Sequence, residues 1–567
     1  MLPRDEFKTG ASFLEATRGQ IARREASRKK GGTLPALSPR RRETASPSVG
    51  LASPPPAVLT WAVRLNDSAV PMRFSELIST SGSTALVRGE AEILKIAYDS
   101  RRVEPGTLFV ALGGVSHDAL AYLGDALKRG AAAVLAPASP PAGVELPWAV
   151  SDDTRRALAE LAAHWFGHPA KKLRLVGVTG TNGKTTCAHL IAGILKAAGC
   201  NPALLGTTGY WLGDRWEEAE WTTPEPLKLH GLFREAADAG LKDVVMEVTS
   251  HALDQQRTAG LEFAAGGFTN VTPEHLDYHR RLEGYYATKC RLFTQLAPGS
   301  PALLNADDPL VAGTPVPEGR PILYGLGEKA ELRATDIRLG RRSLAFTARW
   351  GGWRLPLETP LVGEHDVYNA LLALGVARSL GVEDGSIAEG ARTLPQIPGR
   401  FHFLETGAEF DVVVDYAHTP DGLAKALTAA RRIAARRVLI VFGSAGERDA
   451  VKRPDMGRVA GELADVVVLT TEDPRREDPA KIAREIASGV PPGSCELLII
   501  LDRRRAVHRA LELAKKGDLV IVAGKGDEYR LKFADRVERS NDIDLCLEYF
   551  GLTRDQAGVR SPRPSDA

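Results

Sequence analysis

A short segment rich in glycine and threonine has the residue types needed to hold phosphate. It reads Thr179-Gly180-Thr181-Asn182-Gly183-Lys184-Thr185-Thr186, and it lies between a strand-like apolar run and a helix-like run. Glycines let backbone N–H groups approach phosphate oxygens, and the N-terminus of the following helix adds positive potential. Lys184 can reach terminal phosphates, and Thr185 can offer a hydroxyl to Mg²⁺. The common spacing would place glycine where this chain has Val178, so the segment is a variant phosphate loop, and it predicts a nucleoside triphosphate as ligand.

Acidic and histidine side chains follow two later apolar runs. Glu247 closes the run 243–247, and a carboxylate at a strand end near a phosphate loop is well placed to hold Mg²⁺. His251 follows closely, and the segment 270–279 contains Glu274 and His275 among several acids and histidines. Such a group fits a metal or substrate site, and it fits equally well a helix N-terminus with capping acids. The local sequence leaves both interpretations open.

The elements that must position these residues alternate in type. Around the phosphate loop we predict a helix after one strand, and further buried strands later. Strands that alternate with helices favour a parallel, doubly wound α/β sheet. The predicted strands are 173–178, 244–248 and 266–269, and the predicted helix is 185–198.

Two further α/β regions flank this one. The first is small, with strands at 93–97, 107–112 and 131–135 and helices at 119–129 and 154–166. The last is a second parallel-sheet region, with strands at 412–415, 438–442, 466–470, 497–501 and 519–523. Turn-rich segments near Gly167 and Pro398 separate the regions. We therefore expect domains at 72–168, 169–397 and 398–567.

Composition excludes several classes of protein. The chain has 567 residues and a formal net charge of only +2, and its five cysteines form no CxxC pair. A disulfide scaffold and a thiolate zinc site are therefore excluded, and a reducing, cytoplasmic setting is favoured. No apolar run approaches the length of a membrane span, so we expect no membrane insertion.

Residues 1–71 differ from the rest of the chain. They hold 12 Lys and Arg against 6 Asp and Glu, and their apolar residues are scattered. We expect a disordered basic extension, because such a segment buries too little area to offset chain entropy. Its acids argue against a transit peptide. An alternative is that translation begins at Met72.

Taken together, the motifs resemble those of the Mur ligases over 72–567. That resemblance implies three domains: a small N-terminal α/β domain that binds UDP, a central P-loop ATPase-like parallel sheet, and a C-terminal Rossmann-like domain. The motifs are TGTNGKTT (179–186), MEVTSHALDQQR (246–257), FTNVTPEHLDYH (268–279), YYATKCRLF (285–293), NADD (305–308), PGRFH (398–402), VVDYAHTPDGL (413–423), FGSAGERDAVKRPDMG (442–457), EDPRREDP (472–479) and GKGDE (524–528).

The resemblance also implies a reaction. ATP would phosphorylate the terminal carboxylate of UDP-MurNAc-L-Ala-D-Glu, and the amine of a diamino acid would attack the acyl phosphate, in peptidoglycan precursor synthesis. The partners are then these three small molecules, with no nucleic acid, and the protein would act as a monomer. Mg²⁺ would be the metal, and CO₂ would enter as a carbamate on one lysine.

Residue roles carry over position by position. For the metal the resemblance implies Glu247, His275, Thr185 and Lys289, the last as N6-carboxylysine. For ATP it implies the loop residues Gly180, Thr181, Asn182, Gly183, Lys184, Thr185 and Thr186, with Asn305, Asn369, Arg400, Asp415 and His418. For UDP-MurNAc-dipeptide it implies Ser100, Thr222, Thr223, Thr249, Gln255 and Arg257; for the amino acid it implies Arg448, Glu472, Asp473, Pro474, Arg475, Gly524 and Glu528.

The chain departs from the family pattern at two of these sites. Family members often have Asn before the Thr pair, where this chain has Trp221. Relatives that use meso-2,6-diaminopimelate typically read Asp-Asn-Pro-Arg, and here Asp473 replaces the Asn. Arg475 is retained and could pair with a distal carboxylate, which favours diaminopimelate. The charge of Asp473 could instead favour a distal ammonium, as in lysine or ornithine.

Two rival functions remain open on the sequence. One is another ATP-dependent amide ligase, from elsewhere in the Mur family or of the folylpolyglutamate synthetase type. The other is a P-loop ATPase stimulated by nucleic acid, which would bind through the basic residues 1–71. The body of the chain is acidic and contains no nucleic-acid fold motif, which argues against the second.

Overall fold

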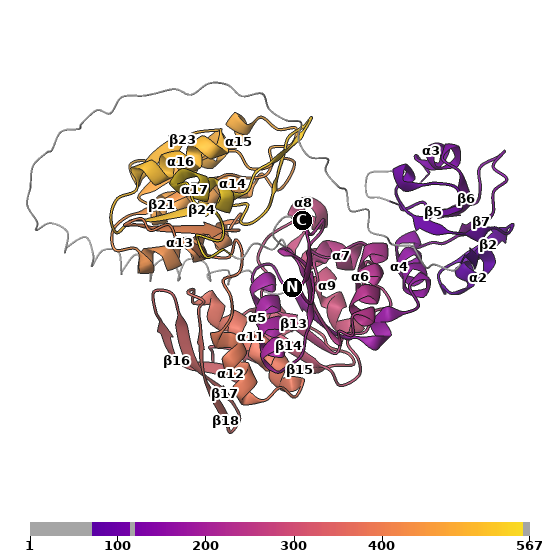
Figure 1. Ribbon diagram of the computed structural model, residues 1–567, viewed down its shortest axis with the longest axis horizontal. Helices are drawn as coiled ribbons and strands as arrows, with labels where there is room; N and C mark the ends of the chain where they lie inside the picture. The colour runs from indigo at the N-terminus through magenta and orange to yellow at the C-terminus, as the bar shows by residue number, and fades with distance from the viewer. Residues whose placement is uncertain (1–70, 114–119, 560–567) are drawn as a thin grey trace, which may run out of the picture. The chain divides into compact units, whose positions relative to one another are not determined.

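The computed structural model describes residues 71–113 and 120–559, and three main sheets carry this part of the chain (Figure 1). The basic extension expected over 1–71 lies outside the described residues, except for Pro71. The short pair β1 (Met72–Arg73) and β3 (Glu92–Ile93) begins the described chain.

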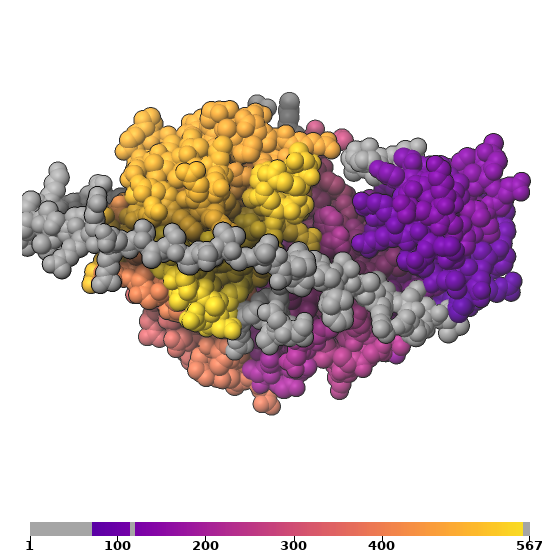
Figure 2. Space-filling view, turned by 45° about the horizontal axis from the view of Figure 1, so that its top comes forward, coloured from indigo at the N-terminus to yellow at the C-terminus, as the bar shows by residue number. Residues whose placement is uncertain are grey.

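The first sheet has the strand order β2-β7-β6-β5-β4. Strands β4 to β7 are parallel, and β2 adds to one edge in the antiparallel direction. In the space-filling view the side chains of this region gather into one indigo body (Figure 2). The elements are β2 (Ala85–Arg88), β4 (Lys95–Ala97), β5 (Thr107–Val110), β6 (Ala131–Ala136), β7 (Trp148–Val150), α2 (Phe74–Ser79), α3 (Leu123–Lys128), α4 (Thr154–Trp165) and η1 (Ser100–Arg102).

The second sheet contains the phosphate loop. Its parallel portion runs in the order β9-β12-β8-β13-β14-β15-β16, so β8 lies between two strands that follow it later in the chain. The order reverses at β8, and ligands collect at the carboxyl ends of strands at such a point. The parallel strands are β8 (Arg174–Thr179), β9 (Ala203–Gly206), β12 (Asp243–Glu247), β13 (Ala265–Phe268), β14 (Pro301–Asn305), β15 (Arg320–Gly325) and β16 (Leu332–Leu339).

Antiparallel strands extend this sheet at both ends. At one end β10 (Gly209–Leu212) and β11 (Arg215–Glu217) follow β9, and at the other β17 (Leu344–Trp350) and β18 (Trp353–Thr359) follow β16. Our sequence analysis missed these strands. A signal existed, because Gly351-Gly352 joins two alternating runs, which is the pattern of a two-residue hairpin turn.

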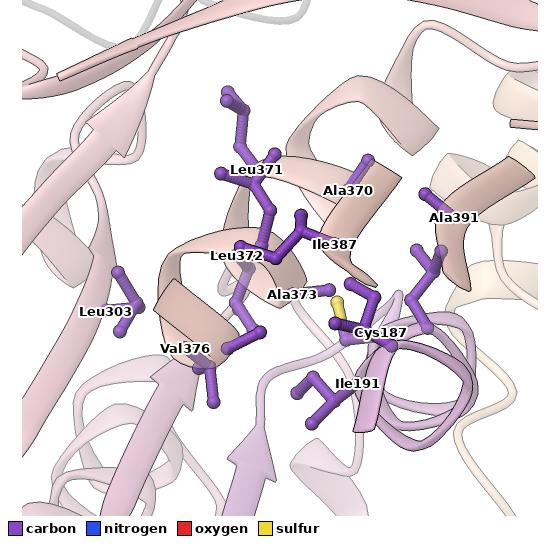
Figure 3. Close-up of a cluster of buried hydrophobic side chains, with 14 of the residues drawn as sticks. Cys187, Ile191, Leu303, Ala370, Leu371, Leu372, Ala373, Val376, Ile387 and Ala391 are labelled. Carbon is purple, nitrogen blue, oxygen red and sulfur yellow. The ribbon is translucent and has the colours of Figure 1, made fainter. Parts of the chain in front are cut away.

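The core of this sheet lies under helices α5, α11 and α12 (Figure 3). Helix α11 is buried along most of its length, so it is apolar nearly all round instead of carrying one apolar stripe. Figure 3 shows Cys187 and Ile191 of α5 facing residues of the other two helices beside Leu303 of β14. The helices are α5 (Lys184–Ala197), α6 (Pro226–Asp238), α7 (Ser250–Asp254), α8 (Leu276–His279), α9 (Leu282–Cys290), α10 (Pro309–Ala312), α11 (His365–Ser379) and α12 (Asp384–Arg392), with η2 (Pro169–Lys172) and η3 (Arg291–Gln295).

The third sheet has the order β19-β20-β24-β21-β22-β23. All its neighbours are parallel except the edge pair β19–β20, so the wholly parallel sheet predicted from the sequence is corrected at that edge. The elements are β19 (His402–Leu404), β20 (Asp411–Asp415), β21 (Val438–Phe442), β22 (Val466–Leu469), β23 (Glu496–Ile499), β24 (Leu519–Ala523), α13 (Pro420–Ile433), α14 (Lys452–Leu463), α15 (Pro479–Ala487), α16 (Arg503–Leu513) and α17 (Asp542–Phe550), with the hairpin β25 (Arg530–Lys532) and β26 (Val537–Arg539).

Most predicted strands are confirmed to within one or two residues, and two elements need correction. The strand predicted over 93–97 is broken at Leu94, whose N–H bonds to Gly106. The helix predicted over 119–129 is shorter, because α3 begins at Leu123. Across the described residues, every helix is too short or too polar to cross a bilayer.

A buried ion pair braces the third sheet. Arg503, at the start of α16, donates to both carboxylate oxygens of Asp542 at 2.7 Å, and both side chains are almost fully buried. The same guanidinium donates to the carbonyl oxygens of Thr471 and Ala523. Arg503 therefore connects two strand ends to α17.

Replacing one partner tests the importance of this pair. We expect Asp542→Ala to lower the free energy of unfolding by about 3–5 kcal/mol, because it leaves an uncompensated buried guanidinium. The measurement is urea unfolding of the full chain. The control is Glu548→Ala, which removes the exposed pair Arg504–Glu548 and should change stability by less than about 1 kcal/mol. Equal effects of the two variants would show that the buried pair has no special role.

Candidate active site

The phosphate loop connects β8 to α5, the strand and helix that the sequence predicted. Gly180 and Gly183 have φ of 141° and 89°, values that L side chains rarely adopt. A Cβ at Gly180 would overlap Thr269 Oγ1, and one at Gly183 would overlap Asn369 Oδ1. Both glycines are therefore required twice, by backbone conformation and by close neighbours.

Two lysines meet at one backbone carbonyl of this loop. Lys184 Nζ donates to the carbonyl oxygens of Gly180 and Thr181 at 2.9 and 2.8 Å, and Lys289 Nζ donates to that of Gly180 at 2.8 Å. Lys289 is 1% exposed, and burial together with the charge of Lys184 holds its pKa well below the usual lysine value. The Lys289 amine is therefore a neutral nucleophile at the floor of the loop.

Oxygen ligands lie beside the start of α5. Thr185 Oγ1 donates to Glu247 Oε2 at 3.0 Å, and the Thr207 N–H donates to Glu247 Oε1 at 2.8 Å. Arg400 Nη2 donates to Thr185 Oγ1 at 2.9 Å. A hydroxyl and a carboxylate this close are the donors that Mg²⁺ prefers, so Thr185 and Glu247 fit the ion.

The histidines predicted near the metal stack on one another. The rings of His251 and His275 have centroids 4.7 Å apart, with His279 also against His251. Burial lowers the pKa of His251 to about 4 and that of His275 to about 3, so both are neutral at pH 7, the form that ligates metals. Among the described residues, no three His, Cys, Asp or Glu side chains form a group that could hold an ion. A metal here would need further ligands such as phosphate oxygens, hydroxyls or water.

Glu274 has a partner that our sequence analysis did not foresee. Its Oε1 lies 3.1 Å from His418 Nε2, while His418 Nδ1 lies 2.8 Å from the Tyr416 carbonyl oxygen. Both imidazole nitrogens thus face acceptors. Burial opposes ionisation of Glu274, but His418, His275 and Lys184 outweigh it and hold the pKa of Glu274 well below its usual value.

One pocket gathers most of the residues predicted to bind nucleotide. It lies beside the N-terminal end of α5 and the loop after β20. Asn305 is not among its lining residues: its amide donates to the Thr269 carbonyl and accepts from the Asp307 N–H, so it braces the end of β14. The predicted residues that line the pocket are Asn182, Gly183, Thr186, Asn369, Arg400, Asp415 and His418.

A cluster of hydroxyls lies on the other side of Glu247. Thr222 contacts Thr207, and Thr223 contacts both Thr249 and the Glu247 carbonyl oxygen. Arg257 donates to the Thr223 carbonyl at 2.8 Å. The structure therefore brings together the residues predicted to hold the dipeptide, with Gln255 bonded to Arg257. Ser100 lies in η1, beside the first sheet.

The residues predicted to hold an amino acid meet at the carboxyl ends of the third sheet. Lys525 Nζ donates to Asp473 Oδ1 at 2.9 Å and to Glu528 Oε2 at 2.8 Å. Tyr416 also donates to Glu528. The charge of Asp473 is therefore compensated within the protein. Lys525 was not among the predicted site residues, although it stands in the GKGDE motif.

Two groups in this cluster keep unused hydrogen-bonding capacity. Within the described residues, the buried atoms Glu472 Oε2 and Arg475 Nε have no hydrogen-bond partner. Burial raises the pKa of Glu472, and burial together with nearby Arg448 lowers the pKa of Arg475. Gly524 leaves space for Glu472, since a Cβ there would overlap Glu472 Oε2. Pro474 follows Asp473, completing the predicted set. An acceptor and a donor left open side by side in the sequence suit a zwitterionic ligand.

Comparison with known proteins identifies the family. Residues 178–377 match the Mur ligase middle domain, and residues 399–526 match the Mur ligase, glutamate ligase domain. A relative from Syntrophomonas wolfei, named UDP-N-acetylmuramoyl-L-alanyl-D-glutamate--2,6-diaminopimelate ligase, is 38% identical over 81% of this chain and 95% of its own length. A Solibacter usitatus protein of the same name is 41% identical over 81% and 94%. The chain belongs to the Mur ligase family.

A solved structure supports the same assignment. The structure of a UDP-N-acetylmuramoyl-L-alanyl-D-glutamate--2,6-diaminopimelate ligase aligns with a TM-score of 0.57 and 29% identity, covering 85% of this chain and 99% of that one. The three-domain Mur ligase fold predicted from the sequence is therefore confirmed.

Proposed function

We propose that this protein is an ATP-dependent ligase that joins meso-2,6-diaminopimelate to UDP-MurNAc-L-Ala-D-Glu in peptidoglycan precursor synthesis. The observation that carries the proposal is the phosphate loop of a Mur ligase, with its predicted nucleotide residues gathered on one pocket. Relatives of the same printed activity match over about four-fifths of the chain. In this assignment residues 72–168 hold the UDP end, 169–397 the ATP and 398–567 the diamino acid.

The chemistry is transfer of a phosphoryl group between two anions. Lys184, at the N-terminus of α5, neutralises charge on the ATP phosphates and orients them toward the substrate carboxylate. Thr185, Glu247 and His275 would hold Mg²⁺, which supplies further charge neutralisation when bound. The amine of the diamino acid then attacks the acyl phosphate carbon, and phosphate leaves as the amide forms. Asn369, Arg400, Asp415 and His418 would position the nucleotide.

An assay of the full chain tests this reaction. With ATP, Mg²⁺, UDP-MurNAc-L-Ala-D-Glu and diaminopimelate, we expect ADP and the tripeptide product in equal amounts, measured by coupled ADP assay and mass spectrometry. Lys184→Ala should lower the rate at least 100-fold, because the phosphates lose their partner in the loop. The matched control is Lys196→Ala, at the exposed end of the same helix, which should react normally. Absence of nucleotide turnover with diaminopimelate, lysine or ornithine would refute the proposal.

Lys289 suits the carbamate that the family resemblance implies. Carbamate formation needs a neutral amine: the nitrogen lone pair attacks CO₂, a proton leaves, and an anionic N-carboxylate results. Burial keeps this amine uncharged, and the Lys184 ammonium bonded to the same carbonyl would pair with the new anion. An exposed lysine would be almost wholly protonated at pH 7 and would not react. We infer that Lys289 is carbamylated and contributes an oxygen ligand.

Carbon-13 NMR tests the carbamate. Protein equilibrated with ¹³C-bicarbonate should show one carbamate resonance that Lys289→Met abolishes and that Lys196→Met retains. Lys289→Ala should lose most activity and regain part of it with added short carboxylic acids, which would replace the missing carboxylate. An unchanged spectrum in Lys289→Met would exclude this residue as the modified lysine.

The amino-acid cluster favours diaminopimelate over lysine. Asp473 is bonded to Lys525, so it is not a free anion awaiting a distal ammonium. Arg475 keeps an unpartnered Nε and lies near Arg448, a combination that attracts a carboxylate. The distal carboxylate of diaminopimelate is the group that lysine and ornithine lack.

Substitution of Arg475 tests this specificity. Arg475→Ala should raise KM for diaminopimelate about 10- to 100-fold, the loss expected for a charge-assisted hydrogen bond, while KM for ATP stays unchanged. Arg476→Ala is the matched control, because the neighbouring side chain is 83% exposed and should matter little. An equal loss for lysine and diaminopimelate in Arg475→Ala would contradict recognition of a distal carboxylate.

A further inference from the structure

Trp221 is a large aromatic side chain that remains 49% exposed at the edge of the hydroxyl cluster. It directly precedes Thr222 and Thr223, the pair predicted to hold the dipeptide end of the substrate. The family resemblance assigns this position no aromatic ring, so nothing in the proposed reaction yet accounts for it.

The backbone of Trp221 is fixed. The Tyr210 hydroxyl donates to the Trp221 carbonyl oxygen at 2.5 Å, and the Trp221 N–H donates to the same hydroxyl at 3.2 Å. Tyr210 is itself 1% exposed, on β10. A buried side chain thus holds both polar groups of one residue, and the segment that displays the indole is tied to the sheet.

One side of the indole ring is also fixed. The Arg257 guanidinium lies 5.1 Å from the ring centroid, within the range of a cation–π contact. Arg257 cannot swing away freely, because it pairs with Glu225 at 2.7 Å and donates to Gln255 and to the Thr223 carbonyl. The exposed part of the ring is therefore a preformed apolar surface beside hydroxyl groups.

We propose that the exposed indole surface of Trp221 stacks on the pyranose ring of the muramoyl sugar and so determines recognition of that sugar. A pyranose presents C–H groups on its face and hydroxyl or amide groups on its edge. The first suits an indole surface, and the second suits the adjoining threonine hydroxyls. This inference rests on the proposed function, because it takes UDP-MurNAc-L-Ala-D-Glu as the ligand.

The surroundings favour the sugar over the other parts of that substrate. Arg257 is already paired with Glu225, so an anionic group would not find a free cation at this ring. The residue predicted to hold uridine, Ser100, belongs to the first sheet, whereas Trp221 adjoins the dipeptide residues in sequence. The sugar is the part of the molecule that connects the uridine diphosphate to the dipeptide.

Calorimetric titration of the full chain tests the stacking. Wild type, Trp221→Phe and Trp221→Leu are titrated with UDP and with UDP-MurNAc-L-Ala-D-Glu. We expect Trp221→Leu to bind the full substrate about 10-fold more weakly and UDP unchanged, while Trp221→Phe, which keeps a ring, retains most of the affinity. KM for the UDP substrate should rise with kcat and KM for ATP unchanged, a split that a general loss of structure would not produce.

Trp353→Phe is the matched control. Trp353, on β18, also carries an arginine over its ring, with Arg378 at 4.1 Å, but it lies outside the hydroxyl cluster. Its substrate affinity should equal that of wild type. Substrate should also change the tryptophan fluorescence of wild type more than that of Trp221→Phe.

Three results would overturn the inference, and they are distinguishable. Unchanged affinity of Trp221→Leu for the full substrate, with wild-type melting temperature, would reject the stacking and leave the proposed function intact. Equal weakening for UDP would assign the ring to the uracil instead of the sugar. Failure of wild type to bind the full substrate at all would reject the proposed function, and this inference with it.

Discussion

The meeting of Lys184 and Lys289 at the Gly180 carbonyl is the interaction on which the site depends. Two amines converge on one acceptor in a buried place, so they cannot both carry full charge without an anion nearby. Glu274 supplies part of that compensation, and a triphosphate would supply more. The loop geometry that permits this convergence needs glycine at 180 and 183, because side chains there would collide with Thr269 and Asn369.

The same principle separates used from unused charge in the third sheet. Lys525 neutralises Asp473 and Glu528, so those residues form a rigid internal network. Glu472 and Arg475 keep unpartnered buried atoms, within the part of the chain described here, and are the groups left to meet a ligand. A charge that is visible in the sequence therefore says little about specificity until its partner is known.

Pre-organisation is the common feature of the three groups of residues. Tyr210 ties the backbone of Trp221, Thr207 holds Glu247, and Tyr416 orients both His418 and Glu528. Residues fixed in advance lose less conformational entropy when a ligand binds. The supporting residues come from elements distant in the chain, so the site depends on correct packing of each sheet.

The sequence by itself determined the phosphate loop, the parallel strands and the family, because these depend on local patterns of apolar residues, glycines and short motifs. It did not determine the antiparallel strands β10, β11, β17 and β18, whose alternation is weak beside the strong buried strands. It also did not determine that Asp473 is neutralised by Lys525, that Lys289 is buried against Gly180, or that Glu274 meets His418. Each of these depends on residues far apart in the chain, and burial and pairing arise only when the sheets bring them together.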